Sequence, residues 1–303
     1  MTAVNGSASQ ARDTGAPRRG PVWHAIRGLF DVASRVAPGF GPRLQRGLIR
    51  TAYWLVSALE RRGDTTFMNY GYAHLDTGGQ PLPGDHGDDS YSVRLYHRVA
   101  SARDLTGLDV LEVGSGRGGG AAFVMRHLGP ASMTGMDFAA TAIRFCRRRH
   151  RVDGLKFEQG DAEHLPFADR SFDAVINVES SHCYPSFENF LREVDRVLRP
   201  GGHFLFADLR HRQGVSTMRA ALAERFEIVD EESITANVFR ALELDSDRRR
   251  RMIETRAPRL LHRALGNFSS VRGSATFSEF ASGNFQYWRF VLRKRASDSQ
   301  PLN

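Results

Sequence analysis

Cysteine, lysine and long apolar runs are scarce in this sequence of 303 residues. With only Cys146 and Cys183 present, a disulfide framework is unsupported, and a reducing cytoplasmic compartment is expected. No stretch reaches the ~20 consecutive apolar residues that a transmembrane helix needs. Residues 1–20 lack the apolar core of a signal peptide, and their composition predicts a disordered tail.

Metal-ligand spacing is also missing from the sequence. Neither C-x-x-C nor H-x-x-x-H occurs, and the adjacent pair His182 and Cys183 is poorly placed to point both side chains at one ion. We therefore predict no metal site.

The formal charge of +8 raises the question of an anionic partner, either nucleic acid or a membrane surface. All of the basic residues except Lys156 and Lys294 are arginine. Genomic base composition explains such a bias as well as arginine chemistry does, so nucleic acid is not the favoured partner.

Residues 21–64 are predicted to form an amphipathic, basic helical arm. Apolar positions recur with helical spacing, for example at Trp23, Ile26 and Leu29, and arginines lie between them. Peripheral membrane contact through 21–62, on anionic lipid, is one explanation of this pattern. A helix packed on the main domain or on the partner of a homodimer is the one we favour.

After a Gly-, Asp- and Pro-rich loop at 74–90 and a helix ending near 104, short apolar runs alternate with helical stretches. Strands are predicted in LDVLEVG, SMTGMD, LKFEQGD, FDAVINVE and GHFLFADL. Apolar strands separated by helices indicate a doubly wound, Rossmann-like parallel sheet. Right-handed crossovers place the carboxyl ends of its strands along one edge, where ligands bind.

The predicted organisation assigns 65–106 to a lid and first helix, 107–295 to the catalytic domain and 296–303 to a tail. A polar helical insertion is expected at 215–265. The alternating segments FSSVRGSATF and NFQYWRFVLRKR, separated by the turn signal SGN, are predicted as the last two strands and would close a seven-stranded α/β sheet.

The segment VLEVGSGRGGG joins the first predicted strand to a helix. Glycines allow a sharp turn and close approach of a ligand, and a helix amino terminus offers free N–H groups. Gly114, Gly116 and Gly119 also satisfy G-x-G-x-x-G, so a NAD-dependent oxidoreductase is an alternative.

Three carboxylates lie near the carboxyl ends of successive predicted strands, the first of them beside this loop. Glu112 is placed to accept from an ammonium group, which S-adenosylmethionine carries, whereas it would repel a pyrophosphate. Asp137 suits the hydroxyls of a ribose, and Asp161 suits the exocyclic amine of adenine. Each could instead cap a helix, but all three together favour a nucleoside cofactor.

The ordered motifs LEVGSGRGGG, GMDF, QGDAEHLPF, SFDAVINVES and VLRPGG resemble the class I S-adenosylmethionine-dependent methyltransferases. A narrower resemblance, to the phthiotriolone and phenolphthiotriolone dimycocerosates methyltransferases, lies in FMNYGY, LYHR, CRRRHR, NVESSHCYPSF, ADLR and ITANVFR. Ser115 stands where that family usually has cysteine. The resemblance implies the class I fold, S-adenosyl-L-methionine as cofactor and O-methylation of a lipid.

The predicted site combines these arguments with the resemblance. Cofactor contacts are expected from Tyr70, Tyr72, Glu112, Gly114, Ser115, Gly116, Gly118, Asp137, Phe138, Asp161, Ala162, Asn177 and Glu179. Substrate contacts are expected from Tyr96, His97 and Tyr184.

A hydroxyl acceptor requires a base, because a neutral alcohol is a poor nucleophile, and histidine is the usual one. His182 follows the fourth predicted strand and Asp208 ends the fifth, and adjacent strands lie ~4.8 Å apart. The two side chains can therefore meet, as they do in the rebeccamycin-type sugar O-methyltransferases that this arrangement resembles. We predict an O-methyltransferase acting on a lipid, polyketide or other secondary metabolite, with His182 as base and Asp208 as its partner. A nucleic-acid methyltransferase is a further alternative.

Overall fold

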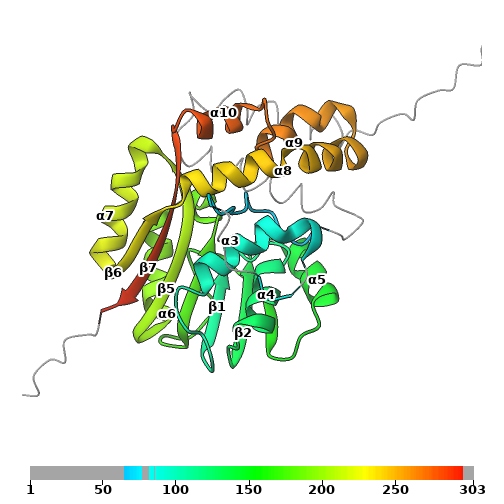
Figure 1. Cartoon of the computed structure of the whole chain (residues 1–303). Helices are drawn as coiled ribbons and strands as arrows, with labels where there is room; N and C mark the ends of the chain where they lie inside the picture. Colours follow the sequence, from blue (N-terminus) through cyan, green and yellow to red (C-terminus); the bar gives the residue numbers. More distant parts are fainter. Residues whose placement is uncertain (1–64, 77–81, 85, 296–303) are drawn as a thin grey trace, which may run out of the picture.

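The computed structural model describes residues 65–76, 82–84 and 86–295. The predicted tails at 1–20 and 296–303 and the arm at 21–64 lie outside the described residues, so membrane contact and dimerisation through the arm remain predictions. Element labels follow Figure 1.

Seven strands form one mixed sheet in the order β3-β2-β1-β4-β5-β7-β6. The strands are β1 (Asp109–Val113), β2 (Ser132–Asp137), β3 (Leu155–Gln159), β4 (Phe172–Val178), β5 (Leu198–His211), β6 (Phe226–Ser233) and β7 (Phe285–Lys294). The first five run parallel, and β7 pairs antiparallel with both β5 and β6. The predicted seven-stranded, doubly wound sheet is confirmed.

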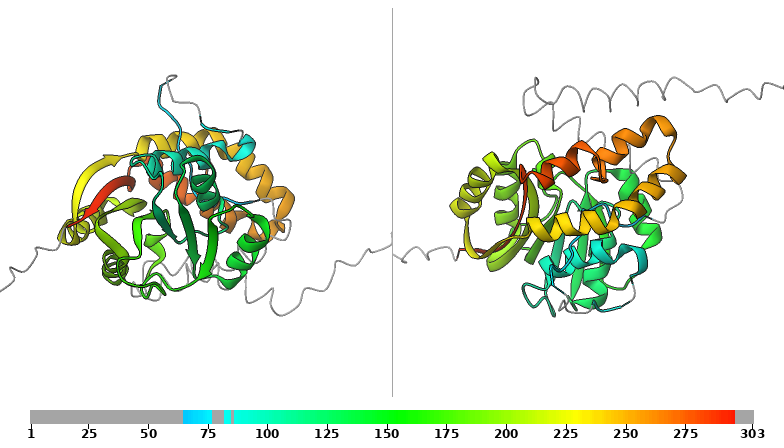
Figure 2. Two further views of the ribbon diagram at one scale, coloured as in Figure 1. Left: turned by 90° about the horizontal axis from the view of Figure 1, so that it is seen from below. Right: turned by 45° about the horizontal axis from the view of Figure 1, so that its top comes forward.

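Helices cover both faces of the sheet (Figures 1 and 2). They are α3 (Ser90–Ala100), α4 (Gly119–His127), α5 (Ala140–Arg149), α6 (Phe187–Val197), α7 (Val215–Arg225), α8 (Thr235–Arg256), α9 (His262–Phe268) and α10 (Ala275–Ala281). Short 3-10 turns occupy Gly87–Asp89, Ser181–Cys183, Arg212–Gly214 and Arg259–Leu261. One apolar cluster includes side chains of α3, α4 and α5, and a second includes those of α6 and α7.

The predicted positions of the last two strands need one correction. The segment 268–277 is not a strand: the Ser274 hydroxyl accepts from the Phe277 N–H and caps the amino terminus of α10. The penultimate strand is β6, inside the stretch predicted as helical at 215–265.

Because β6 is rich in acidic residues, its sequence did not predict a strand. Its carboxylates meet arginines of β7, since Arg293 contacts Glu227 at 2.6 Å and Arg289 contacts Asp230 at 2.5 Å. Such cross-strand ion pairs stabilise an edge strand that carries few apolar side chains. The helical insertion therefore lies between β6 and β7, as α8, α9 and α10, and it extends across the edge at which the parallel strands end (Figure 2).

Close packing of α3 on α4 generates a stability prediction. A Cβ on Gly120 would overlap the ring of Tyr96. We expect Gly120→Ala to lower the free energy of unfolding by about 2 kcal/mol, as overpacked cores do, measured by urea denaturation. Gly214→Ala is the matched control, because a Cβ there meets nothing within 4 Å. Equal midpoints for the two variants would contradict the packing argument.

Candidate active site

A cavity of about 130 Å³ opens at the carboxyl ends of the first parallel strands. Of the predicted cofactor residues, its wall includes Gly114, Ser115, Gly116, Asp137, Phe138, Asp161, Ala162 and Glu179. Residues of the loop after β4, namely Ser180, Cys183 and Tyr184, complete one side. We call this space the cofactor cavity.

The loop after β1 requires glycine for two separate reasons. Gly114, Gly116 and Gly118 have positive φ values of 79°, 53° and 77°, which L side chains rarely adopt. A Cβ on Gly114 would also collide with the hydroxyls of Ser180 and Tyr184. The absence of a side chain on Gly114 therefore allows the loop to pack against Ser180 and Tyr184 in the cavity wall.

Asp137 ties this loop to the end of β2. Its Oδ2 accepts from the Gly116 N–H at 2.9 Å, and its Oδ1 accepts from the Ala139 N–H at 2.8 Å. The carboxylate is thereby held in the cavity wall, next to the ring of Phe138, which is 55% exposed. An acidic group beside an exposed aromatic ring fits the ribose and base of a nucleoside cofactor.

Asp161 and Ala162 lie in the same wall, after β3. The Asp161 Oδ1 accepts from the Glu163 N–H at 3.1 Å, so this carboxylate both shapes its own turn and faces the cavity. No helix lies between Asp161 and β4, a stretch that the structure describes in full, so the alternative role as a helix cap does not hold at this position.

Five predicted cofactor residues do not line the cavity, namely Tyr70, Tyr72, Glu112, Gly118 and Asn177. Glu112 is 1% exposed and its Oε1 accepts from the Tyr96 hydroxyl at 2.7 Å, beneath the glycine loop. Burial raises the pKa of Glu112 to about 7. Asn177 is buried and donates to the Val113 carbonyl at 2.8 Å, and Tyr72 belongs to the main core. These three side chains support the site from behind, as does Gly118 at the amino terminus of α4.

Of the three predicted substrate residues, one lines the cofactor cavity and two do not. Tyr184 lines the cofactor cavity, where its hydroxyl lies 2.9 Å from the Ser180 Oγ. Tyr96 is buried against Glu112, and the ring of His97 packs on Phe123 at 6.2 Å. Their positions in α3 give no support to substrate contact by Tyr96 or His97.

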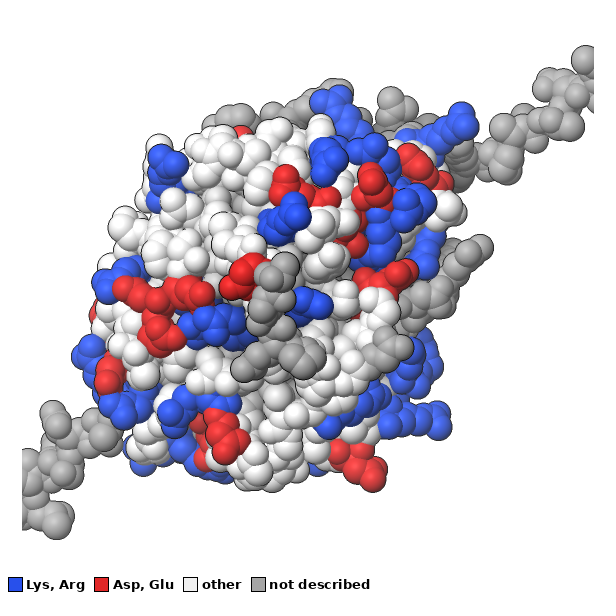
Figure 3. Space-filling model, in the orientation of Figure 1, with Lys and Arg blue, Asp and Glu red and all other residues white. Residues whose placement is uncertain are grey.

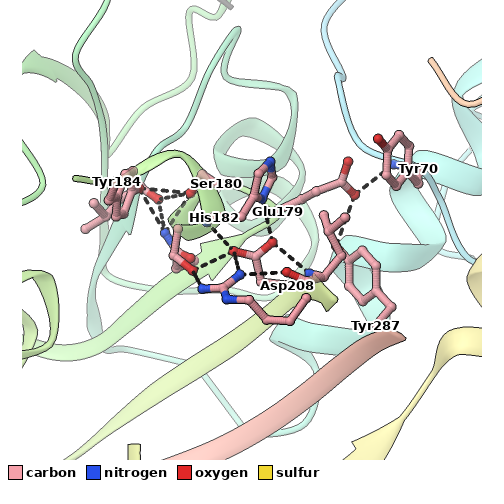
Figure 4. Close-up of polar contacts among 12 residues, drawn as sticks. Tyr70, Glu179, Ser180, His182, Tyr184, Asp208 and Tyr287 are labelled. Atoms are coloured by element: carbon pink, nitrogen blue, oxygen red, sulfur yellow. Dashed lines mark hydrogen bonds and ion pairs between the residues drawn. The ribbon is translucent and has the colours of Figure 1, made fainter. Parts of the chain in front are cut away.

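The predicted pairing of His182 with Asp208 is present in the structure (Figure 4). The His182 Nδ1 lies 2.8 Å from the Asp208 Oδ1, and the His182 N–H donates to the Asp208 Oδ2 at 2.9 Å. The same carboxylate accepts from the Ser181 hydroxyl at 2.5 Å and contacts the Arg210 guanidinium at 3.0 Å. The imidazole is therefore held in one orientation by a fully buried anion.

The electrostatics of the pair follow from these contacts. Burial opposes protonation of His182, but the neighbouring Cys183 and the Asp208 carboxylate outweigh it and hold the pKa of the imidazole well above its usual value. Burial acts against ionisation of Asp208, yet His182 and Arg210 keep the pKa of this carboxyl below its usual range. Both shifts favour an imidazolium beside a carboxylate.

Glu179 connects this pair to the segment before α3. Its backbone is strained, with a φ of 54°, and its Oε2 accepts from the Tyr70 N–H at 2.9 Å and the Tyr287 hydroxyl at 3.0 Å (Figure 4). Tyr70 thus meets the cofactor-cavity wall through its backbone. Burial raises the pKa of Glu179 to about 7.

Several wall residues were not predicted from the sequence, notably Thr66, Met68, Arg117 and Cys183. The Arg117 guanidinium lies 3.7 Å from the centre of the Phe145 ring, and the Cys183 thiol belongs to the turn that carries His182. Their sequence signal is weak: Met68 lies in FMNYGY, Arg117 in the glycine loop and Cys183 in NVESSHCYPSF, whereas Thr66 lies in none of these motifs.

Comparisons with known proteins agree with this geometry. Residues 111–206 match a family described as a methyltransferase domain. The chain is 38% identical over 269 residues to a fatty-acid O-methyltransferase of Mycolicibacterium smegmatis, covering 88% of this chain and 97% of the relative. The chain belongs to the S-adenosylmethionine-dependent methyltransferases. S-adenosylmethionine is accordingly its cofactor, and the oxidoreductase alternative is set aside.

Other relatives place this methyltransferase near mycobacterial lipid enzymes. It is 40% identical to a phthiotriol/phenolphthiotriol dimycocerosates methyltransferase of Mycobacterium tuberculosis, over 76% of this chain and 86% of that one. The geranyl diphosphate C-methyltransferase of Streptomyces coelicolor shares its fold, with a TM-score of 0.57 and 17% identity over 81% of this chain and 97% of that one. At this identity the likeness shows the fold alone.

Two further findings concern the described residues only. None of their helices has the length and apolar character needed to cross a membrane. Both cysteines are free thiols, and the Cys146 Sγ lies 3.4 Å from the Gly116 carbonyl oxygen, against the glycine loop.

The exposed ring of Phe138 provides a test of the cofactor cavity. Stacking of a base on an aromatic ring contributes ~1–3 kcal/mol, so we expect Phe138→Ala to weaken S-adenosylmethionine binding by about tenfold, measured by calorimetry. Stability should hardly change, because the ring is 55% exposed. Leu75→Ala is the control, since Leu75 is 64% exposed and outside the cavity wall. An unaltered affinity in Phe138→Ala would remove the ring from the cofactor site.

Proposed function

We propose that this methyltransferase methylates an oxygen atom of a lipid or related secondary metabolite, with His182 as the general base. The observation that carries the proposal is the oriented His182–Asp208 pair, whose histidine lies on the same turn as the cofactor-cavity residues Ser180 and Cys183. Bound S-adenosylmethionine supplies the methyl group. The protein supplies the orientation of the acceptor and a site for its proton.

His182 and Asp208 have different roles in the proposed proton transfer. When His182 is neutral, its Nδ1 donates to Asp208, which leaves Nε2 as the nitrogen that can accept a proton. Asp208 then stabilises the imidazolium that forms, while its bonds to Ser181 and Arg210 keep the ring in place. Removal of the hydroxyl proton makes the acceptor oxygen a better nucleophile.

Relatives support a lipid acceptor. Two of them are named for fatty-acid O-methylation and for methylation of phthiotriol or phenolphthiotriol dimycocerosates. The charge pattern gives little support to nucleic acid, because arginine and lysine are interleaved with acidic residues on the face in Figure 3.

A carboxylate is a second candidate acceptor, favoured by the raised pKa of His182. A carboxylate is already ionised at neutral pH and needs no base. An imidazolium at His182, which the raised pKa of this group favours, could instead donate a hydrogen bond to it. The two acceptor classes therefore assign opposite protonation states to the same histidine.

Substitution of the pair tests the base. With a long-chain alcohol as acceptor, we expect His182→Ala to lower kcat by about 100-fold, the usual range for a lost general base, without changing the Kd of S-adenosylmethionine. Asp208→Asn should lower kcat too, because the ring loses its anionic partner. Methyl transfer is followed by product mass spectrometry. Wild-type kcat in His182→Ala would refute the assignment.

The pH profile separates the two acceptor classes. If His182 accepts a proton from a hydroxyl, kcat/KM for dodecanol rises with pH until the pH passes the raised pKa of His182. If the imidazolium orients a carboxylate, kcat/KM for dodecanoic acid falls through the same pKa. His182→Ala should remove this dependence of kcat/KM on pH in either case. A pH dependence that persists in the variant would arise from another titratable group.

A further inference from the structure

A second and larger cavity, of about 430 Å³, adjoins the cofactor cavity. It lies between the segment 65–70, the start of α3, the carboxyl-terminal half of α8 and α9. Its volume is within the ~300–1,000 Å³ typical of ligand pockets and exceeds that of the cofactor cavity, which is about 130 Å³.

One wall of this second cavity is apolar. Met252 and Ile253 of α8 face it together with Leu261, Leu265 and Phe268 of the insertion. Unbranched and branched aliphatic side chains of this kind bind hydrocarbon and offer no hydrogen bond to a polar group. The insertion between β6 and β7 thus provides the apolar wall of the second cavity.

Arg248 and Arg249 of α8 also line this cavity and are satisfied within the protein; its other charged residues are Asp88, Asp89, Arg117 and Arg256. Arg248 binds both oxygens of Asp245, at 2.5 and 2.6 Å. Arg249 binds the same carboxylate at 2.8 Å and donates to the Tyr70 carbonyl at 3.0 Å. These guanidinium groups therefore hold α8 to the segment that carries Tyr70, and the uncharged part of the cavity is the wall that contains Met252, Ile253, Leu261, Leu265 and Phe268.

The two cavities meet at Met68 and Arg117, which line both. A Cβ on Gly116 would approach the Met68 Cε to 3.0 Å, so the methionine lies directly over the glycine loop. Tyr70 lines the second cavity, and its N–H bonds to Glu179 in the wall of the first. A chain in the second cavity could therefore extend toward the cofactor cavity past the flexible thioether of Met68.

We propose that the second cavity binds the hydrocarbon chain of the methyl acceptor and sets the chain length that the enzyme prefers. The inference rests on the proposed function, since it assigns a tail site to the same acceptor. Its ligand class is an unbranched aliphatic chain attached to the oxygen that is methylated.

Straight-chain alcohols from hexanol to dodecanol test the proposal. For the wild type we expect kcat/KM to rise with each methylene, by up to about fourfold, until the chain fills the cavity. Met252→Trp places an indole in the apolar wall and should lower kcat/KM for dodecanol at least tenfold while changing that for hexanol less than twofold. Met252→Ala should move the preference toward longer chains.

Leu244→Trp is the matched control, because Leu244 lies on the same helix, is 48% exposed and is outside the cavity wall. The Kd of S-adenosylmethionine should be equal in all variants, which reports folding of the adjoining site. A Met252→Trp enzyme that keeps the wild-type dependence on chain length would overturn the tail site.

Calorimetry with dodecanol, in the presence of S-adenosylhomocysteine, separates failure of the tail site from failure of the proposed function. Loss of binding in Met252→Trp, with binding intact in Leu244→Trp, supports the cavity even if no alcohol is methylated. In that case the proposed reaction on hydroxyls is wrong and the tail site stands. Equal binding in wild type and Met252→Trp refutes the tail site whatever the turnover.

Discussion

The buried charge of Asp208 is the constraint on which the reacting end of this protein depends. The carboxylate has no exposed surface, and an unpaired ion in such a position costs several kcal/mol. It is compensated by the ring and N–H of His182, the hydroxyl of Ser181 and the guanidinium of Arg210. Because all of these groups except Arg210 come from the turn after β4, that turn can adopt only one arrangement, and it directs Cys183 to the cofactor cavity.

A second buried carboxylate, Glu179, fixes the positions of residues on the other side of the site. It joins the end of β4 to the Tyr70 backbone and to Tyr287 of β7 through one oxygen. The strained backbone of Glu179 is maintained by these contacts and by its N–H bond to the Ala207 carbonyl. The segment before α3, which separates the two cavities, is therefore held by the same strand end that carries the proposed base.

Sequence reasoning succeeded where local pattern and strand order were sufficient. The glycine loop, Asp137 and the His182–Asp208 pair all follow from the rule that parallel strands end at one edge. It failed at β6, whose glutamates and aspartate resemble a solvated helix until the arginines of β7 are placed beside them. Helical spacing also does not tell which buried partner a hydroxyl will meet, and the hydroxyl of Tyr96, a predicted substrate residue, donates to Glu112.

The sequence by itself determined the fold class, the cofactor loop and the identity of the two residues proposed to handle the proton, since each depends on neighbours in the chain or on adjacent strands. Only the tertiary structure decided that Glu112 and Asn177 support the loop from behind, and that α8 and α9 enclose a second cavity against residues 65–70. Some of these contacts join residues more than 100 positions apart, such as Arg249 and Tyr70. Local periodicity contains no information about which of these distant surfaces will meet.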